Sequence, residues 1–188
     1  MLKNCSKKVQ VNKVISKASE LKEEINKLMA DLYLLKVKID DHIEYKQITK
    51  NFSEKEFACK GKNCCHGYVL IDYELVFELQ KLRDFIQEKT GKEHKIIITR
   101  GYSCPKHNQE IGGKSNSGHL KGKAADSYCE GLTLAQYWLL IEEAVKANVC
   151  NFPGKGSYPE EDLPVIHLDL LQRFQRWCRR DGKYHYLF

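Results

Sequence analysis

The first 46 residues carry apolar side chains at alternating steps of three and four residues. This is an a/d heptad register over four repeats, typical of a coiled-coil helix. The pattern predicts a helix from roughly Lys8 to Tyr45, about 57 Å long at about 1.5 Å per residue. We therefore expect residues 1–46 to be a coiled-coil oligomerisation helix. The register positions are Val11, Val14, Ala18, Leu21, Ile25, Leu28, Leu32, Leu35, Ile39 and His42.

The same pattern allows more than one packing partner. Ile at a with Leu at d favours a parallel dimer, whereas Ile15, Met29 and Ile43 widen the stripe and favour a larger bundle. A long amphipathic helix folded back on its own domain is the other alternative. We expect a homo-oligomer formed through residues 11–43.

Residues 47–188 read as a separate domain of mixed helices and strands. Apolar residues at helical spacing predict helices over residues 71–87 and 132–148. Strands are expected at 95–102, 124–129 and 165–170, and a loop at 151–163, near which three of the four prolines lie. The expected fold class is α+β, with helices packed on a small antiparallel sheet.

Composition limits the partners of the chain. With 31 Lys and Arg against 25 Asp and Glu, the formal net charge is +6, which fits diffuse attraction to anionic polymers. It fits nucleic acid too, but no nucleic-acid-binding motif is present. A solvated, lysine-rich surface is the simplest interpretation. No apolar run approaches the roughly 18 to 20 residues that cross a bilayer, so no membrane span is expected.

The strongest chemical signal is a set of two histidines and one carboxylate. His119, Asp126 and His167 together supply the three protein ligands of a catalytic zinc, which leaves a fourth position for water. Bound zinc lowers the pKa of water enough to make a nucleophile near neutral pH. The alternative is a loop histidine, a turn-capping aspartate and a hydrogen-bonded strand histidine with no metal.

Several sequence blocks carry a family resemblance that favours the zinc interpretation. From Asn51 to Phe188 the chain resembles the zinc D-alanyl-D-alanine carboxypeptidases and L-alanyl-D-glutamate endopeptidases, cell-wall peptidases of bacteria and phages with a hedgehog-like core. The blocks, in order, are NFSEKEFACKGKNC, IDYELVFELQKLRDFI, IIITRGYSCPKHNQEIGGKSNSGHLKGKAAD and GKGSYPEEDLPVIHLDL, with Trp177 near the end.

The resemblance implies roles for particular residues. His119, Asp126 and His167 would bind Zn²⁺, and Ser117 would contact the substrate carboxylate. The implied substrate is a peptide that contains a D-amino acid, such as the stem peptide of peptidoglycan.

The chain departs from the family at the general base. Many relatives have a carboxylate three residues before the last histidine ligand, where this chain has Pro164. The nearest branch has His-x-Asp, which is His167-Leu168-Asp169 here. Alternate residues of a strand share a face, so Asp169 would either activate water or orient His167. The loop acids Glu160, Glu161 and Asp162 are the other candidate bases.

The second departure concerns an arginine. Relatives read Ser-Gly-Tyr-Arg after the central strand, whereas this chain reads Arg100-Gly101-Tyr102-Ser103. A guanidinium at position 100 is long enough to reach the scissile carbonyl and stabilise its charge. The alternative is a surface arginine paired with an acid.

The eight cysteines include one local cluster. Cys59, Cys64 and Cys65 lie close together, with His66 beside them, and Cys104 follows the central strand. The resemblance covers positions near Cys59, Cys64 and Cys104 and implies that they meet in space. Free thiols, a disulfide formed after release, and a structural zinc site stay open. Cys5, Cys129, Cys150 and Cys178 show no such pattern.

Two functions follow from these observations. The first is a zinc metallopeptidase that cleaves peptidoglycan stem peptides, as an endolysin does. The second is a catalytically silent metal-binding module for wall binding or virion assembly, multimerised by the coiled coil. The N-terminus lacks the apolar segment of a signal peptide. We therefore expect synthesis in the cytoplasm and action at the cell wall after release, or association with a virion.

Overall fold

A computed structural model describes residues 15–29, 31–32 and 44–187 of the chain. The chain divides into two units, Met1–Glu44 and Tyr45–Phe188. In the first, residues 15–29 and 31–32 are helical, and apolar side chains such as those of Ile25 and Leu28 are exposed. The heptad positions Val11, Val14, Leu35, Ile39 and His42, and also Ile43, lie outside the described residues. The expectation that the helix reaches Tyr45 is wrong, because residues 44–46 are not helical.

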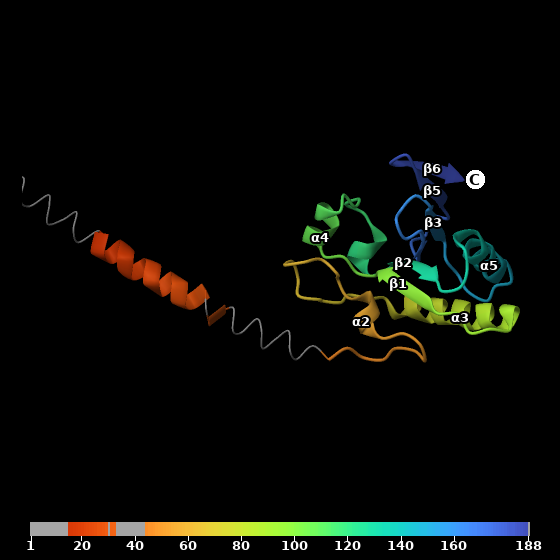
Figure 1. Ribbon diagram of the computed structural model, residues 1–188, viewed down its shortest axis with the longest axis horizontal. Coiled ribbons are helices and arrows are strands. Elements are labelled where there is room, and N and C mark those ends of the chain that lie inside the picture. Colours follow the sequence, from red (N-terminus) through yellow and green to blue (C-terminus); the bar gives the residue numbers. More distant parts are fainter. Residues whose placement is uncertain (1–14, 30, 33–43, 188) are drawn as a thin grey trace, which may run out of the picture. The chain divides into compact units, whose positions relative to one another are not determined.

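The second unit is built on one six-stranded sheet with the strand order β1-β2-β4-β3-β5-β6 (Figure 1). All neighbouring strands are antiparallel except β3 and β5, which are parallel. The predicted α+β fold with a mostly antiparallel sheet is therefore confirmed. The strands are β1 (Ile96–Arg100), β2 (Ala124–Cys129), β3 (Gly154–Tyr158), β4 (Val165–Asp169), β5 (Arg176–Arg180) and β6 (Lys183–Leu187).

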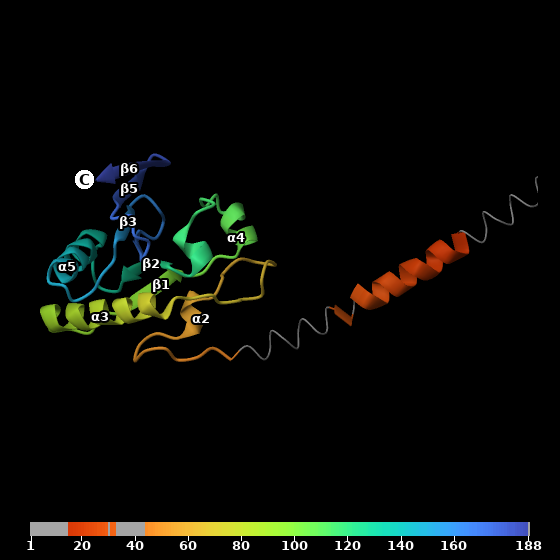
Figure 2. The same ribbon diagram turned by 180° about the vertical axis from the view of Figure 1, so that it is seen from behind.

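Two long helices, α3 (Tyr73–Thr90) and α5 (Leu134–Lys146), lie together beside this sheet (Figures 1 and 2). Asp72 caps α3, Thr133 caps α5 in a capping box, and Gly91 ends α3 in the left-handed conformation. The apolar faces of both helices cover the strand side chains that point towards them. These buried residues include Leu75, Leu79, Ile86, Ile141, Ile98, Ile166 and Leu168. Both predicted helices are confirmed, with shifted ends.

Alternation along the strands separates this core from the opposite face of the sheet. On β4, Ile166 and Leu168 belong to the core, so His167 and Asp169 point to the other face. On β2, Ala125 and Cys129 belong to the core and Asp126 points away. The short segments on the rest of the chain are α2 (Glu54–Phe57), α4 (Pro105–Glu110) and the 3₁₀ helix η1 (Gly118–Lys121).

The loop expected at residues 151–163 is only partly correct, because the structure forms β3 in its middle. A side chain on Gly154 would meet the Asp169 carboxylate at 2.3 Å, and one on Gly156 would meet the Trp177 ring at 2.1 Å. Each glycine thus makes room for a neighbouring side chain on the face that carries His167. Between them, Lys155 is buried and lies 3.3 Å from Glu142 of α5.

No helix among the described residues is long and apolar enough to span a membrane.

Candidate metal centre

Three elements bring the predicted ligands together. His119 lies on η1, Asp126 on β2 and His167 on β4. Asp126 and His167 are direct partners across the antiparallel β2–β4 pair, so both side chains leave the same face. Ser117 caps η1, its hydroxyl accepting a hydrogen bond from the His119 amide at 3.3 Å. All three ligand side chains are buried.

The donor atoms of these residues converge on one point. Asp126 Oδ1 lies 2.7 Å from His167 Nδ1 and 3.3 Å from His119 Nε2, and the two ring nitrogens are 3.2 Å apart. Two imidazole nitrogens and one carboxylate oxygen are the donors that catalytic zinc sites use. All three atoms lie within 4.8 Å of one another, so the residues fit a zinc ion.

The far nitrogen of each histidine is also held. His119 Nδ1 lies 2.7 Å from the Gly101 carbonyl oxygen, and His167 Nε2 lies 3.1 Å from Asp169 Oδ2. Metal-binding histidines commonly donate their second ring N–H to a carbonyl or carboxylate in this way, which fixes ring orientation and tautomer. The carbonyl of Gly101 was not predicted from the sequence, because a backbone oxygen leaves no signal in residue type.

The Asp169 carboxylate contacts several other groups of the protein. Besides His167, it accepts a hydrogen bond from the Leu171 amide at 2.8 Å, and Arg173 lies 3.4 Å away. The side chain is buried. Of the two predicted roles, these contacts favour orientation of His167 over proton transfer from water.

The charges of the metal-free site are strongly interdependent. Burial opposes a charge on Asp126, but His119 and His167 outweigh it and lower the Asp126 pKa well below its ordinary value. Burial also opposes a charge on His167, yet hydrogen bonds to Asp126 and Asp169 raise its pKa to about 9. Burial lowers the pKa of His119. In the absence of metal, a proton on His167 therefore compensates the two carboxylates.

Arg100 reaches the centre because β1 carries a bulge. Ile98 pairs with Ser127 and Arg100 with Asp126, so β1 has one extra residue, Thr99, in this register. Bulges of this kind redirect side chains next to active sites. The Arg100 guanidinium lies 4.0 Å from Asp126 and donates hydrogen bonds to Ser103 at 2.9 Å and Asn108 at 3.0 Å.

The loop acids differ in their surroundings. Glu160 accepts a hydrogen bond from the Asp181 amide at 2.8 Å, and Glu161 lies 4.0 Å from Arg179. Burial and then the negative charge of Asp126 raise the pKa of Glu161, whereas Arg179 and Arg100 oppose that rise. Glu161 thus lies near enough to the centre for the charge of Asp126 to raise its pKa.

A cleft opens above the metal ligands, lined by aromatic and cationic side chains. Trp177 of β5 packs against His167 at 5.5 Å between ring centres and against Tyr184 of β6 at 5.1 Å. Lys114 donates a hydrogen bond to Tyr186 at 3.2 Å. The other lining residues include Arg100, Ser117, Tyr158 and Arg173. Tyr184 and Tyr186 were missed because β6 was not predicted as a strand, and Tyr158 was missed because β3 was assigned to a loop.

Comparison with known proteins identifies the family. Residues 50–158 match the peptidase M15 family, whose metallopeptidases are zinc-dependent. No curated protein and no solved structure matches the chain. The family match includes His119 and Asp126 but ends before β4, so it is the structure that adds His167 to the set. More than half of the chain is matched and a fitting zinc site is present: the chain belongs to the peptidase M15 family of zinc metallopeptidases.

Proposed function

We propose that this metallopeptidase hydrolyses D-amino-acid-containing stem peptides of peptidoglycan, in cell-wall lysis or remodelling of the phage-lysin type. One observation carries the proposal: His119, Asp126 and His167 meet at the base of a cleft, with the outer ring nitrogens of both histidines already oriented. Family membership supports peptide hydrolysis, and the residues around the cleft support the substrate class.

The residues of the chain divide the catalytic work between them. His119, Asp126 and His167 would hold zinc, which supplies polarisation of the scissile carbonyl and activation of water. Arg100, aimed at the centre by the bulge in β1, stabilises the negative charge that develops on the carbonyl oxygen. We assign proton acceptance to Glu161, because Asp169 is occupied by His167 and Leu171, whereas burial and the charge of Asp126 raise the Glu161 pKa in the metal-free protein.

The cleft also fits an anionic peptide. Arg100, Lys114 and Arg173 all line it, so three cations lie around the metal ligands. A stem peptide carries carboxylates at its C-terminus and on its D-glutamate, and guanidinium groups bind carboxylates in a bidentate manner. Ser117, at the start of η1, adds a hydroxyl that can contact the substrate carboxylate.

The delivery of the enzyme is part of the proposal. We place its synthesis in the cytoplasm and its action at the cell wall after release, or on a virion. The helix that includes residues 15–29 and 31–32 joins copies of the chain through its exposed apolar stripe. Linked copies would raise the apparent affinity for a polymeric wall without new contacts.

The test is mass spectrometry of purified peptidoglycan treated with the zinc-loaded protein. Loss of a terminal D-alanine identifies a carboxypeptidase, and cleavage between L-alanine and D-glutamate identifies an endopeptidase. His119→Ala should abolish both zinc binding at this centre and product release, while the exposed-strand control His185→Ala should retain both. Binding to the wall with no product from any wall type would contradict the proposal and favour the silent binding module.

A further inference from the structure

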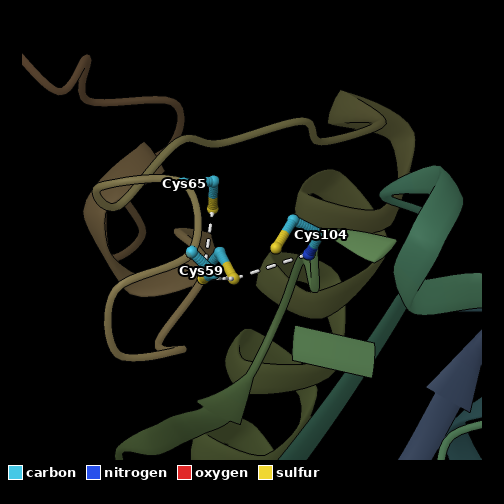
Figure 3. Close-up of side chains that lie close together, drawn as sticks. Cys59, Cys65 and Cys104 are labelled. Carbon is cyan, nitrogen blue, oxygen red and sulfur yellow. Dashed lines mark hydrogen bonds between the residues drawn. The ribbon is translucent and has the colours of Figure 1, made fainter. Parts of the chain in front are cut away.

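Four cysteines form a second donor cluster outside the His-Asp-His centre. Cys59, Cys64 and Cys65 come from the loop between α2 and α3, and Cys104 caps α4. Figure 3 shows Cys59, Cys65 and Cys104 close together. The Sγ atoms of all four lie within 4.8 Å of one another, although Cys59 and Cys104 are 45 residues apart. Such convergence of distant segments places four soft ligands around one point.

The spacing of the sulfur atoms matches a metal tetrahedron. Sγ of Cys64 lies 3.8 Å from that of Cys59 and 3.7 Å from that of Cys65. Four sulfurs that each lie ~2.3 Å from a central zinc are about 3.8 Å apart. A disulfide would need two of these atoms to approach to about 2.05 Å and would join only two of the four cysteines.

The backbone around the cluster supports this arrangement. The Cys104 amide donates a hydrogen bond to Cys59 Sγ, and the His107 amide donates one to Cys104 Sγ, each at 3.4 Å. Amide donors of this kind stabilise the charge of metal-bound thiolates. In the metal-free form the Cys64 thiol donates to the Gly61 carbonyl at 3.2 Å, a bond that metal binding would replace.

The loop is shaped closely around the sulfurs. A side chain on Gly61 would meet Cys64 Sγ at 2.7 Å and the His107 ring at 2.6 Å. Asn63 and His66 have positive φ angles of 55° and 52°, which turn the chain back on itself on both sides of Cys64 and Cys65. These turns bring two neighbouring cysteines to the same centre.

The loop between α2 and α3 has only a small apolar cluster of its own. Its apolar cluster consists of Cys59, Tyr102 and Cys104, with Cys64 and Cys65 packed against them. Between α2 and α3, residues 58–72 form no helix or strand. Small substructures without an adequate apolar core are commonly stabilised by a metal or a disulfide.

We propose that Cys59, Cys64, Cys65 and Cys104 bind one structural zinc ion, distinct from the metal at His119, Asp126 and His167. All four coordination positions are filled by protein, as in structural zinc sites, so no position is left for a substrate. The ion cross-links the loop after α2 to the start of α4.

This cross-link lies next to the segment that positions a ligand of the other centre. Three residues before Cys104, the Gly101 carbonyl holds the His119 ring, and the Ser103 amide donates to the His119 carbonyl at 3.1 Å. Fixing Cys104 therefore fixes the chain that orients His119. The cysteine site thus influences the other centre only by holding the backbone that orients His119.

Metal analysis of four proteins tests the proposal. Inductively coupled plasma mass spectrometry should find two zinc ions per wild-type chain, and one in the double variant His119→Ala/His167→Ala. Cys59→Ser/Cys104→Ser should lose the other ion. Cys178→Ser changes a cysteine outside the cluster and should keep both.

X-ray absorption at the zinc edge of His119→Ala/His167→Ala gives a result that does not depend on the cysteine variants folding. That protein should show only sulfur ligands at about 2.3 Å. A zinc-free His119→Ala/His167→Ala protein, or one whose zinc has only nitrogen and oxygen ligands, would overturn the cysteine site. Failure of peptidoglycan hydrolysis would leave this result unaffected, so the two proposals fail separately.

Discussion

At the scale of single residues, the chemistry of the centre depends on the groups that hydrogen-bond to the second ring nitrogen of each histidine ligand. The three ligand positions could be predicted because the family resemblance supported them; two histidines and an aspartate at such spacings also occur by chance. The role of Asp169 could be narrowed to two choices by strand alternation. Only the structure shows that Asp169 lies 3.1 Å from His167 Nε2 and accepts a hydrogen bond from the Leu171 amide.

Asp169→Asn should weaken zinc binding because an amide is a poorer acceptor for the His167 ring N–H. We expect an affinity loss of about 10- to 100-fold, measured by competition with a chromophoric chelator. Asp181→Asn, on the exposed β5–β6 turn, is the matched control and should bind zinc normally.

Glu161→Gln tests whether Glu161 or Asp169 is the general base. If Glu161 accepts the proton, this variant should lose roughly 10²- to 10⁴-fold in kcat with unchanged zinc affinity. Glu160→Gln should be nearly unaffected. The opposite pattern, with Asp169→Asn losing turnover at full zinc occupancy, would assign Asp169 as the base.

His167 should make the stability of the metal-free protein depend on pH. Its pKa rises from 6.5 to about 9 on folding, so its stabilising proton is fully present below about pH 6.5 and is lost as pH rises towards 9. The free energy of unfolding should fall over that window by up to about 3 kcal/mol. Urea titrations in chelator between pH 6 and 9.5 measure it.

His167→Gln provides the control, because it lacks the titrating group and should lose less stability over the same window. Adding zinc to the wild type should also flatten the curve, since the metal replaces the proton. Parallel pH profiles for the metal-free wild type and His167→Gln would argue against the charged histidine.

At the scale of elements, hydrophobic periodicity predicted the long helices and the strands that surround a core. The residues of β2 were predicted with the bounds that the structure shows, 124–129. β3 was assigned to a loop because three of the four prolines lie near residues 151–163, and Gly154 and Gly156 add no strand signal. The absence of a side chain at these two positions leaves room for Asp169 and Trp177 on the neighbouring strands. The pattern of a single sequence carries no information on such neighbours.

Gly156→Ala should displace the Trp177 ring, because the new methyl group would lie 2.1 Å from it. Overpacking of this kind costs about 1–3 kcal/mol of stability. It should also raise KM for peptide substrates, since Trp177 lines the cleft. A double-mutant cycle with Trp177→Ala is the measurement, and the cost of Gly156→Ala should shrink when the ring is absent. Full additivity would mean that the ring does not oppose the methyl group.

At the scale of the whole molecule, we expect the exposed apolar stripe of the N-terminal helix to join copies of the chain. Ile25 and Leu28 are about 60% exposed, 58% and 61% respectively, at successive a and d positions. Ile25→Gln/Leu28→Gln should convert an oligomer into a monomer, as measured by analytical ultracentrifugation. The control Lys22→Gln/Lys27→Gln changes other helix positions. An identical mass for wild type and Ile25→Gln/Leu28→Gln would exclude self-association through this stripe.

The metal ligands and most of the aromatic lining of the cleft lie in different stretches of the chain. The ligands and their orienting partners all lie at or before Asp169, whereas Trp177, Tyr184 and Tyr186 follow it. β5 joins the sheet through β3, and β6 joins only through β5, so the β1–β2–β4 pairing does not depend on the last hairpin. Evolution, or an engineer, can therefore vary this terminal hairpin, and with it the aromatic lining of the cleft, while the three metal ligands stay on their own elements.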